Sequence, residues 1–158
     1  MLRILVAVDG SERALDAVRF ALRLVQDGAL RATLVLGHVQ EEASLLELAT
    51  HDADAIAQAS VQAGQDLMAS AVALVAAAGV PLQTEIALGS PAAALADMAE
   101  TAGCALIIVG ARGLGGLRGT LLGSVSQALV RDATVPVTVV KHTEPEGEEA
   151  PASERAPL

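Results

Sequence analysis

The sequence predicts a single α/β domain built on a parallel sheet of five strands, with helices on both faces of the sheet. Its 158 residues are a length typical of one domain. Strand-like and helix-like patterns alternate along the chain, which favours parallel strands joined by right-handed helical crossovers. Several strand patterns are continuous apolar runs rich in valine and isoleucine, as expected of strands buried on both faces.

The first strand is predicted over residues 2–8, LRILVAV, an apolar run interrupted by one arginine. Asp9-Gly10-Ser11 follows as a turn that ends in a helix N-cap. A helix then runs from Ser11 to Gly28, because apolar residues recur at helical spacing. These are Ala14, Leu15, Val18, Ala21, Leu22 and Val25.

The middle of the chain predicts two strands and two helices. The second strand covers residues 32–39, and the polar segment 41–54 reads as a loop with a short helix. An alanine-rich helix over residues 55–78 is stopped by the glycine and proline that follow it. A third strand over residues 82–88 leads to Ser90-Pro91, a capping residue followed by proline, which opens a helix that ends near Ala102.

The last two strands are predicted over residues 104–109 and 135–141, with a helix over residues 124–131 between them. A proline in a strand belongs at an edge of the sheet or at the first residue. Pro136 therefore predicts that the fifth strand is an edge strand. An apolar edge invites pairing with another chain, so we expect a homodimer through the strand 135–141.

Composition excludes several classes of function. A net charge of −9 and a single aromatic residue argue against a nucleic-acid partner, which needs a basic surface or stacking rings. The longest uncharged run lies between Asp66 and Glu85, and polar residues and a proline interrupt it, so we expect no membrane span. The N-terminal apolar run is too short for a signal peptide. Cys104 is the single cysteine, which fits a cytoplasmic protein.

The C-terminal segment differs in composition from the rest of the chain. From Glu144 to the end there are five acidic residues and one arginine among prolines, alanines and glycine. Such a segment buries too little apolar surface to fold by itself. We therefore expect one domain over residues 1–142 and a disordered acidic tail over residues 143–158.

The glycine-rich stretch 110–124, GARGLGGLRGTLLGS, is neither of the two familiar phosphate motifs. A Walker A loop needs a lysine that is missing here, and Arg118 stands where a dinucleotide fingerprint needs its third glycine. Gly123-Ser124 nevertheless begins a helix, whose free backbone amides form an anion site. Gly110 and Gly113 would let the chain turn close to a ribose or phosphate. An ordinary loop with a serine cap explains the same residues equally well.

The order of the strands decides whether these residues meet. In open α/β sheets, ligands bind beyond the carboxyl ends of the strands, where the strand order reverses. The residues alone do not fix the order. The order 3-2-1-4-5 would place strand 1 beside strand 4, so that Asp9 and Gly110 face one crevice. A ribose diol suits the Asp9 carboxylate, although a favourable position near the positive end of the following helix explains an acid there as well.

The spacing Gly110-x2-Gly113-x9-Gly123-Ser124 resembles that of the ATP-binding branch of the universal stress protein family. Other segments between residue 2 and about residue 142 are similar to the same family. They are ILVAVDGSE (4–12), GHV (37–39), LIIVGARGLGGL (106–117), LLGSVS (121–126) and PVTVVK (136–141).

The resemblance implies a Rossmann-like sheet of order 3-2-1-4-5, a dimer through the last strand, and a bound adenine nucleotide. The nucleotide would be ATP, or ADP or AMP, with or without Mg²⁺. Asp9 would contact the nucleoside part and the backbone of Val39 the adenine. The residues that would hold ribose and phosphates are Gly110, Gly113, Gly123 and Ser124, and those that would line the pocket are Ala7, Val8, Val109 and Val125. Beside these, either Arg112 or Arg118 would neutralise phosphate charge.

The expected function is that of a nucleotide-dependent sensor or regulator in a stress response. No residue is an obvious base placed to activate water, so we name no catalytic residue. A slow ATPase or self-phosphorylating enzyme is one alternative, and a dimeric adapter that binds no nucleotide is another. The three histidines lie far apart and lack cysteine partners, so we expect no metal site built by the protein alone, although His38 would border the pocket.

Overall fold

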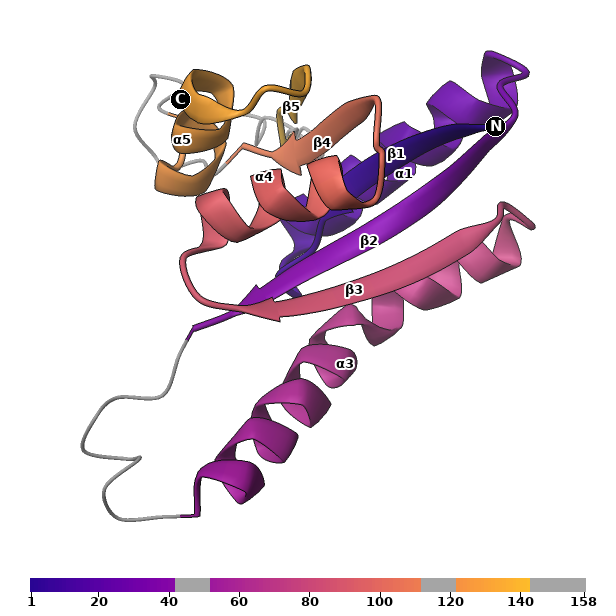
Figure 1. Cartoon of the computed structure of the whole chain (residues 1–158). Coiled ribbons are helices and arrows are strands. Elements are labelled where there is room, and N and C mark those ends of the chain that lie inside the picture. Colours follow the sequence, from indigo (N-terminus) through magenta and orange to yellow (C-terminus); the bar gives the residue numbers. More distant parts are fainter. Residues whose placement is uncertain (42–51, 112–121, 143–158) are drawn as a thin grey trace, which may run out of the picture.

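The computed structural model describes residues 1–41, 52–111 and 122–142. Figure 1 shows the elements that they form. In chain order these are β1 (Leu2–Ala7), α1 (Glu12–Asp27), β2 (Ala32–Gln40), α3 (Ala53–Ala77), β3 (Leu82–Leu88), α4 (Pro91–Thr101), β4 (Leu106–Gly110), α5 (Ser124–Asp132) and β5 (Val137–Val140). The predicted alternation of strands and helices is confirmed.

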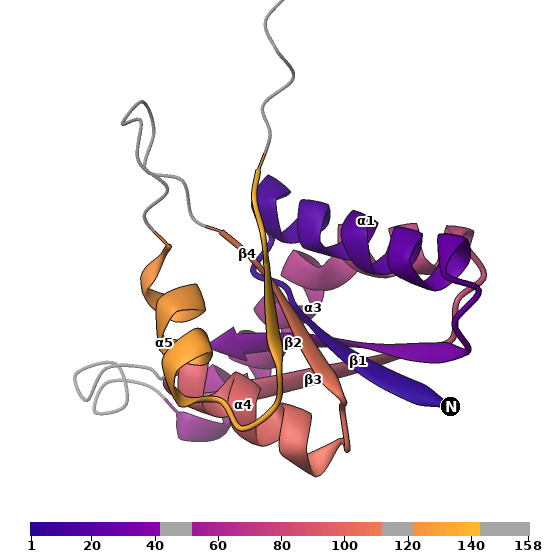
Figure 2. The same ribbon diagram turned by 90° about the horizontal axis from the view of Figure 1, so that it is seen from above.

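The five strands form one sheet in the order β3-β2-β1-β4-β5, and every neighbouring pair is parallel. This is the predicted Rossmann-like order. Figures 1 and 2 show α1 and α3 on one face of the sheet and α4 and α5 on the other. The order reverses between β1 and β4, and their carboxyl ends lie side by side because Val6 pairs with Ile108 in the ladder.

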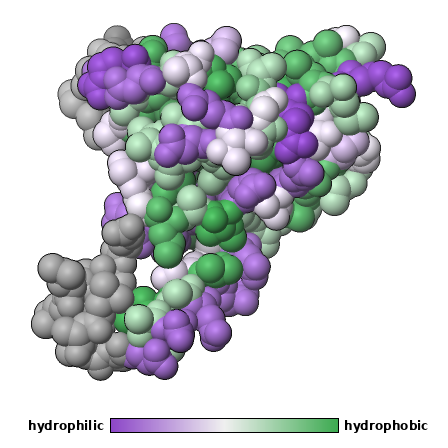
Figure 3. Space-filling model, viewed as in Figure 1, coloured by the Kyte–Doolittle hydropathy of each residue, from purple (hydrophilic) through white to green (hydrophobic). Residues whose placement is uncertain are grey.

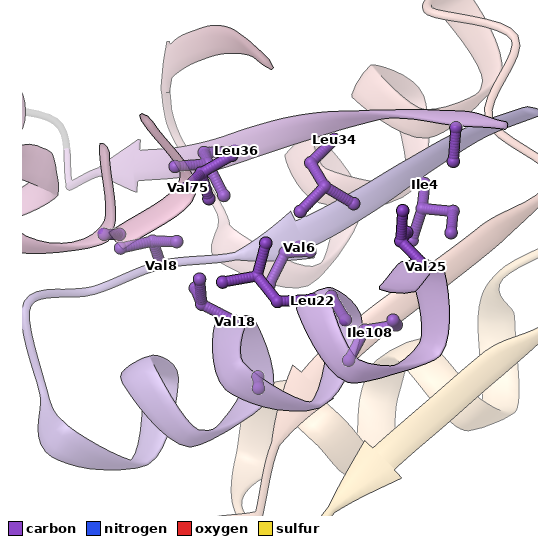
Figure 4. Packing of buried hydrophobic residues seen from close by; sticks show 14 of the residues in the cluster. Ile4, Val6, Val8, Val18, Leu22, Val25, Leu34, Leu36, Val75 and Ile108 are labelled. Atoms are coloured by element: carbon purple, nitrogen blue, oxygen red, sulfur yellow. The ribbon is translucent and has the colours of Figure 1, made fainter. Parts of the chain in front are cut away.

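Alternate residues of the central strands supply two separate cores. One core lies between the sheet and the helices α1 and α3, and Figure 4 shows Ile4, Val6 and Ile108 pointing toward α1. The other lies under α4 and α5 and receives Leu5 and Ile107. Each of these five side chains is fully buried. The continuous apolar strands of the sequence are therefore explained by burial on both faces of the sheet.

Two predicted strand boundaries are too early in the chain. Cys104 was expected in the fourth strand, but its amide donates to the carbonyl of Ala99 and closes the end of α4 after Gly103, whose φ is +65°. Cys104 is buried, and this burial raises the pKa of its thiol. The fifth strand begins at Val137 and not at residue 135, because Pro136 has no amide hydrogen and joins β4 only through its carbonyl.

A side-chain hydrogen bond ties the end of β5 to α1. His142 follows β5, and its Nδ1 is hydrogen-bonded to Asp16 on α1, which also accepts from Arg19 at 2.8 Å. The hydrogen bond from His142 holds the pKa of Asp16 below its ordinary value. This contact fixes the point at which the chain leaves the sheet.

Several predictions concern residues outside the described ranges. They include most of the predicted loop 41–54, the glycine-rich span 112–121 and the acidic tail 143–158. None of the described helices is long and apolar enough to cross a membrane. On the α4 face, hydrophilic residues are interspersed with hydrophobic ones (Figure 3).

Candidate functional site

A cavity of about 550 Å³ lies where the strand order reverses. Its walls come from the carboxyl ends of β1, β2 and β4 and from the first residues of α1, α4 and α5. In Figure 1 the arrowheads of β2, β3 and β4 point to the left, toward the starts of α4 and α5. The fold therefore brings three helix N-termini together at the carboxyl ends of the strands. The first backbone amides of a helix lack helical hydrogen-bond partners.

The structure places nine of the eleven predicted site residues around this cavity. They are Ala7, Val8, Asp9, Val39, Val109, Gly110, Gly123, Ser124 and Val125. The other two, Arg112 and Gly113, lie outside the described residues. The grouping follows from the strand order, because residues from four distant segments meet only if β1 lies beside β4. That these residues contact a ligand remains a prediction.

Asp9 is held by the turn that leads into α1. Its Oδ1 accepts hydrogen bonds from the backbone amide of Ser11 at 3.0 Å and from the Ser11 hydroxyl at 2.5 Å. Gly10 between them has a φ of +83°, a conformation that favours glycine. The Ser11 hydroxyl also accepts from the amide of Ala14 and caps α1. One carboxylate oxygen of Asp9 is therefore used by the turn, and the exposed side chain keeps Oδ2 for another donor.

Val39 lies in the part of β2 that extends beyond the end of β1. The ladder between these strands ends at Ala7 and Gly37, whereas β2 remains paired with β3 up to Gln40 and Leu88. The carbonyl of Gly37 accepts from the amide of Val8, so it points toward β1. Every second residue of a parallel strand points its amide and carbonyl to the same side. Val39 therefore presents one donor and one acceptor to the cavity edge that β1 has left free.

The start of α5 offers backbone amides to the cavity. Gly123 is the N-cap residue, so Ser124 is the first residue of the helix and not its cap. The first helical hydrogen bond runs from the amide of Gln127 to the carbonyl of Gly123, which also accepts from the Ser126 hydroxyl at 3.0 Å. The amides of residues 124–126 thus precede the helical hydrogen bonds and carry the positive end of the helix dipole.

Packing against α1, and not only a ligand, requires glycine at position 110. A Cβ atom built on Gly110 would lie 2.6 Å from the backbone carbonyl oxygen of Arg13. Any side chain there would push the first turn of α1 away from the end of β4. The small residue therefore allows α1 and β4 to meet at the cavity.

His38 lies in the wall of the cavity between β1 and the end of β2. It is buried, and its Nδ1 is 2.7 Å from the carbonyl oxygen of Val8, while its Nε2 is 2.9 Å from Oε1 of Gln40. Because a carbonyl only accepts, Nδ1 carries the hydrogen in this arrangement. His38 thus fixes the backbone next to Asp9 and is not free to bind a ligand through Nδ1.

Sequence reasoning did not assign several residues of the cavity wall. These are Ser11, Arg13, Ala14, Gly37, Glu41, Ser90, Pro91, Ala92, Leu95, Ser126 and Ala128. Ser90-Pro91 was recognised as a helix start, but its place in the wall depends on how α4 crosses the sheet. Arg13 stands in the first turn after Asp9, and that position was the available signal for it.

Metal ligands do not gather in this region. Across residues 1–41, 52–111 and 122–142, no three side chains of His, Cys, Asp or Glu lie together in a way that would hold a metal ion. Asp9 and Glu41 are the acidic residues of the cavity wall as far as it is described. Any divalent cation here would need ligand atoms from a bound molecule as well.

Comparison with known proteins identifies the family. The sequence model of the Universal stress protein family matches residues 1–141. Universal stress protein YxiE of Bacillus subtilis is 32% identical over 147 residues, which cover 88% of this chain and 98% of that protein. Among solved structures, universal stress protein UspA of Lactobacillus plantarum shares 26% identity at a TM-score of 0.70, covering 88% of this chain and 97% of that one.

A second solved structure is described as a universal stress protein in complex with cAMP. It shares 27% identity with this chain at a TM-score of 0.67 and covers 90% of this chain and 98% of its own. The match to the family spans the whole sheet and its helices, from β1 to β5. The chain belongs to the universal stress protein family.

Proposed function

We propose that the protein binds an adenine nucleotide, foremost ATP, in the cavity between β1 and β4, and acts as a nucleotide-dependent regulator in a stress response. The observation that carries this proposal is the arrangement of three kinds of polar group around one cavity. Strand β2 offers a backbone donor and acceptor, the β1 turn offers a carboxylate, and α5 offers free amides. We place this activity in the cytoplasm, where a free thiol such as Cys104 stays reduced.

Each part of a nucleotide has a matching group in the cavity wall. The free amide and carbonyl of Val39 suit the edge of adenine, which presents an amino donor beside a ring acceptor. The carboxylate of Asp9 suits the two hydroxyls of a ribose, as acidic residues do in other α/β nucleotide sites. The amides at the start of α5 suit phosphate oxygens. Across the carboxyl ends of the strands, the three groups come in the order Val39 on β2, Asp9 after β1, and the start of α5. A nucleotide has its base, sugar and phosphates in the same order.

The relatives support an adenine nucleotide as the ligand. The solved structure in complex with cAMP combines the same fold with a cyclic adenine nucleotide. We propose ATP because the cavity wall includes both Asp9 and the N-terminus of α5, whose free amides would bind the phosphates that follow the ribose. Mg²⁺ would accompany ATP, with the phosphates supplying most of its oxygen ligands and Asp9 offering a carboxylate from the cavity wall.

Thermal unfolding with and without Mg-ATP tests the proposal. A ligand present at about 100 times its dissociation constant stabilises the folded state by about 2.7 kcal/mol. We expect Mg-ATP at millimolar concentration to raise the unfolding temperature by several degrees, and adenosine to raise it less. An unchanged melting curve at 5 mM Mg-ATP, roughly 100 times a 50 μM dissociation constant, would count against nucleotide binding.

We further propose that the protein is a homodimer through the strand 135–141. Strand β5 lies at the edge of the sheet, and β4 is its neighbour there. The carbonyls of Pro136 and Val140 accept hydrogen bonds from the amides of Ile107 and Ala111, so the amide of Val139 points to the open edge. Light scattering should give twice the chain mass of 15.9 kDa. Val139→Pro removes that outward amide, and it should yield monomers. A monomer mass for the unaltered protein at micromolar concentration would reject the dimer.

A further inference from the structure

Arg13 is the second residue of α1 and lies in the wall of the cavity. In the part of the chain that the structure describes, it is the only lysine or arginine in that wall. The chain as a whole has a net charge of −9. A cation at this place is therefore not explained by a generally basic surface.

The Nε atom of the Arg13 guanidinium has no hydrogen-bond partner among the described residues. This Nε is buried, and none of the ion pairs among the described residues includes Arg13. Arg3 also has a buried Nε without a partner, but its Nη2 donates to the side-chain oxygen of Gln83. Buried polar groups without partners are rare, and each calls for an explanation such as a functional role.

The acidic residues close to Arg13 in the sequence already pair with other side chains or backbone groups. Asp9 accepts two hydrogen bonds from Ser11. Asp16 accepts from His142 and from Arg19, and Arg19 also lies 3.6 Å from Glu12. Among the described residues, Arg13 is thus outside the charge network of its own helix, and it lines the cavity.

The position of Arg13 is fixed by the backbone around it. Its carbonyl oxygen packs against Gly110 at the end of β4, where a Cβ atom would lie 2.6 Å away. The N-terminus of α5 lines the same cavity. Helices α1 and α5 lie on opposite faces of the sheet (Figure 2), so Arg13 and the α5 amides are two positive groups that border one cavity from different sides.

We propose that Arg13 pairs with a phosphate group of the bound nucleotide and makes the site prefer phosphorylated nucleotides over nucleosides. This inference rests on the proposed nucleotide binding and adds a residue and a selectivity to it. A guanidinium forms paired hydrogen bonds with phosphate oxygens. A neutral nucleoside offers it no such partner, so Arg13 contributes affinity for ATP and none for adenosine.

The test compares ATP and adenosine binding by equilibrium dialysis of the full chain and its variants. Hydrogen bonds to charged groups correspond to about 10- to 100-fold in affinity. Arg13→Gln should weaken ATP binding by that factor and change adenosine binding by less than twofold. Arg13→Met keeps the apolar stem that packs along the helix, and it serves as a second variant if glutamine disturbs folding. Arg23→Gln is the matched control, because Arg23 is exposed on the same helix and lies outside the cavity wall.

The possible results distinguish a failure of the Arg13 role from a failure of nucleotide binding itself. A selective loss of ATP affinity in the Arg13 variants, with Arg23→Gln unchanged, supports the role of Arg13. If wild-type protein and Arg13→Gln bind ATP within twofold of each other, Arg13 does not bind phosphate although the nucleotide site stands. If ATP and adenosine lose affinity equally, Arg13 shapes the cavity and does not select phosphate. If wild-type protein binds neither molecule, the proposed function itself fails.

Discussion

Replacing Gly123 with valine is expected to weaken ATP binding by about 100-fold or more, because it alters the anion site at the start of α5. Gly123 is the N-cap residue, and the amides of residues 124–126 behind it have no helical partners. A branched side chain at the cap keeps phosphate oxygens away from these amides. The φ of Gly123 is −64°, which valine adopts without strain, so the fold should survive.

A control variant separates the loss of the anion site from the loss of a helix cap. Valine is a poor N-cap residue and destabilises a helix by about 1 kcal/mol. Asp52 is the N-cap of α3 and does not line the cavity, so Asp52→Val should reduce stability without changing ATP affinity. Dialysis with labelled ATP gives both affinities, and thermal melts show that the variants are folded. If Gly123→Val binds ATP as tightly as the wild-type protein, the amides at the start of α5 do not bind the phosphates.

Ile108→Ala is expected to reduce the free energy of unfolding by about 3 kcal/mol, within the usual range for a large aliphatic residue cut to alanine in a core. Ile108 is fully buried on β4, pairs with Val6 of β1, and belongs to the core that faces α1. Removing most of its side chain leaves a cavity between the sheet and α1, beside the point at which the strand order reverses. Urea unfolding followed by circular dichroism measures the loss.

Two further substitutions give the scale of that loss. Ile108→Val removes one methylene group and should cost about 1 kcal/mol. Val130→Ala lies on the exposed side of α5, where the side chain is 52% exposed, and it should change stability by less than about 0.5 kcal/mol. Equal stability of Ile108→Ala and wild-type protein would contradict the packing described for the sheet.

The sheet was predictable from the sequence because the signals that build it are local. The apolar runs around Ile4 and Ile108 mark strands buried on both faces, and Pro136 marks the edge strand. The strand order was predictable only by combining these signals with the family resemblance. The start of β4 was misplaced because the end of α4 uses the amide of Cys104, which an apolar run does not reveal.

The cavity wall was less predictable because distant packing builds it. Arg13 lies at the cavity because Gly110 lets the first turn of α1 approach β4. Its position soon after Asp9 in the sequence hints at the cavity, but the contact with β4 depends on a residue almost a hundred positions later. The start of α4 at Ser90 reaches the same space only because β3 and β2 are neighbours in the sheet. Val39 was assigned to the adenine contact through the family resemblance. The structure adds a physical reason: β1 ends before it reaches Val39, so the backbone groups of Val39 that point toward β1 have no strand partner.

Equilibrium dialysis of wild-type protein against labelled ATP tests the central claim most directly. We expect saturable binding of about one ATP per chain at ligand concentrations below about 1 mM, with unlabelled ATP displacing the label. Equal concentrations of label on both sides of the membrane, with protein at 100 μM and ATP at up to 1 mM, would contradict nucleotide binding in the cavity between β1 and β4.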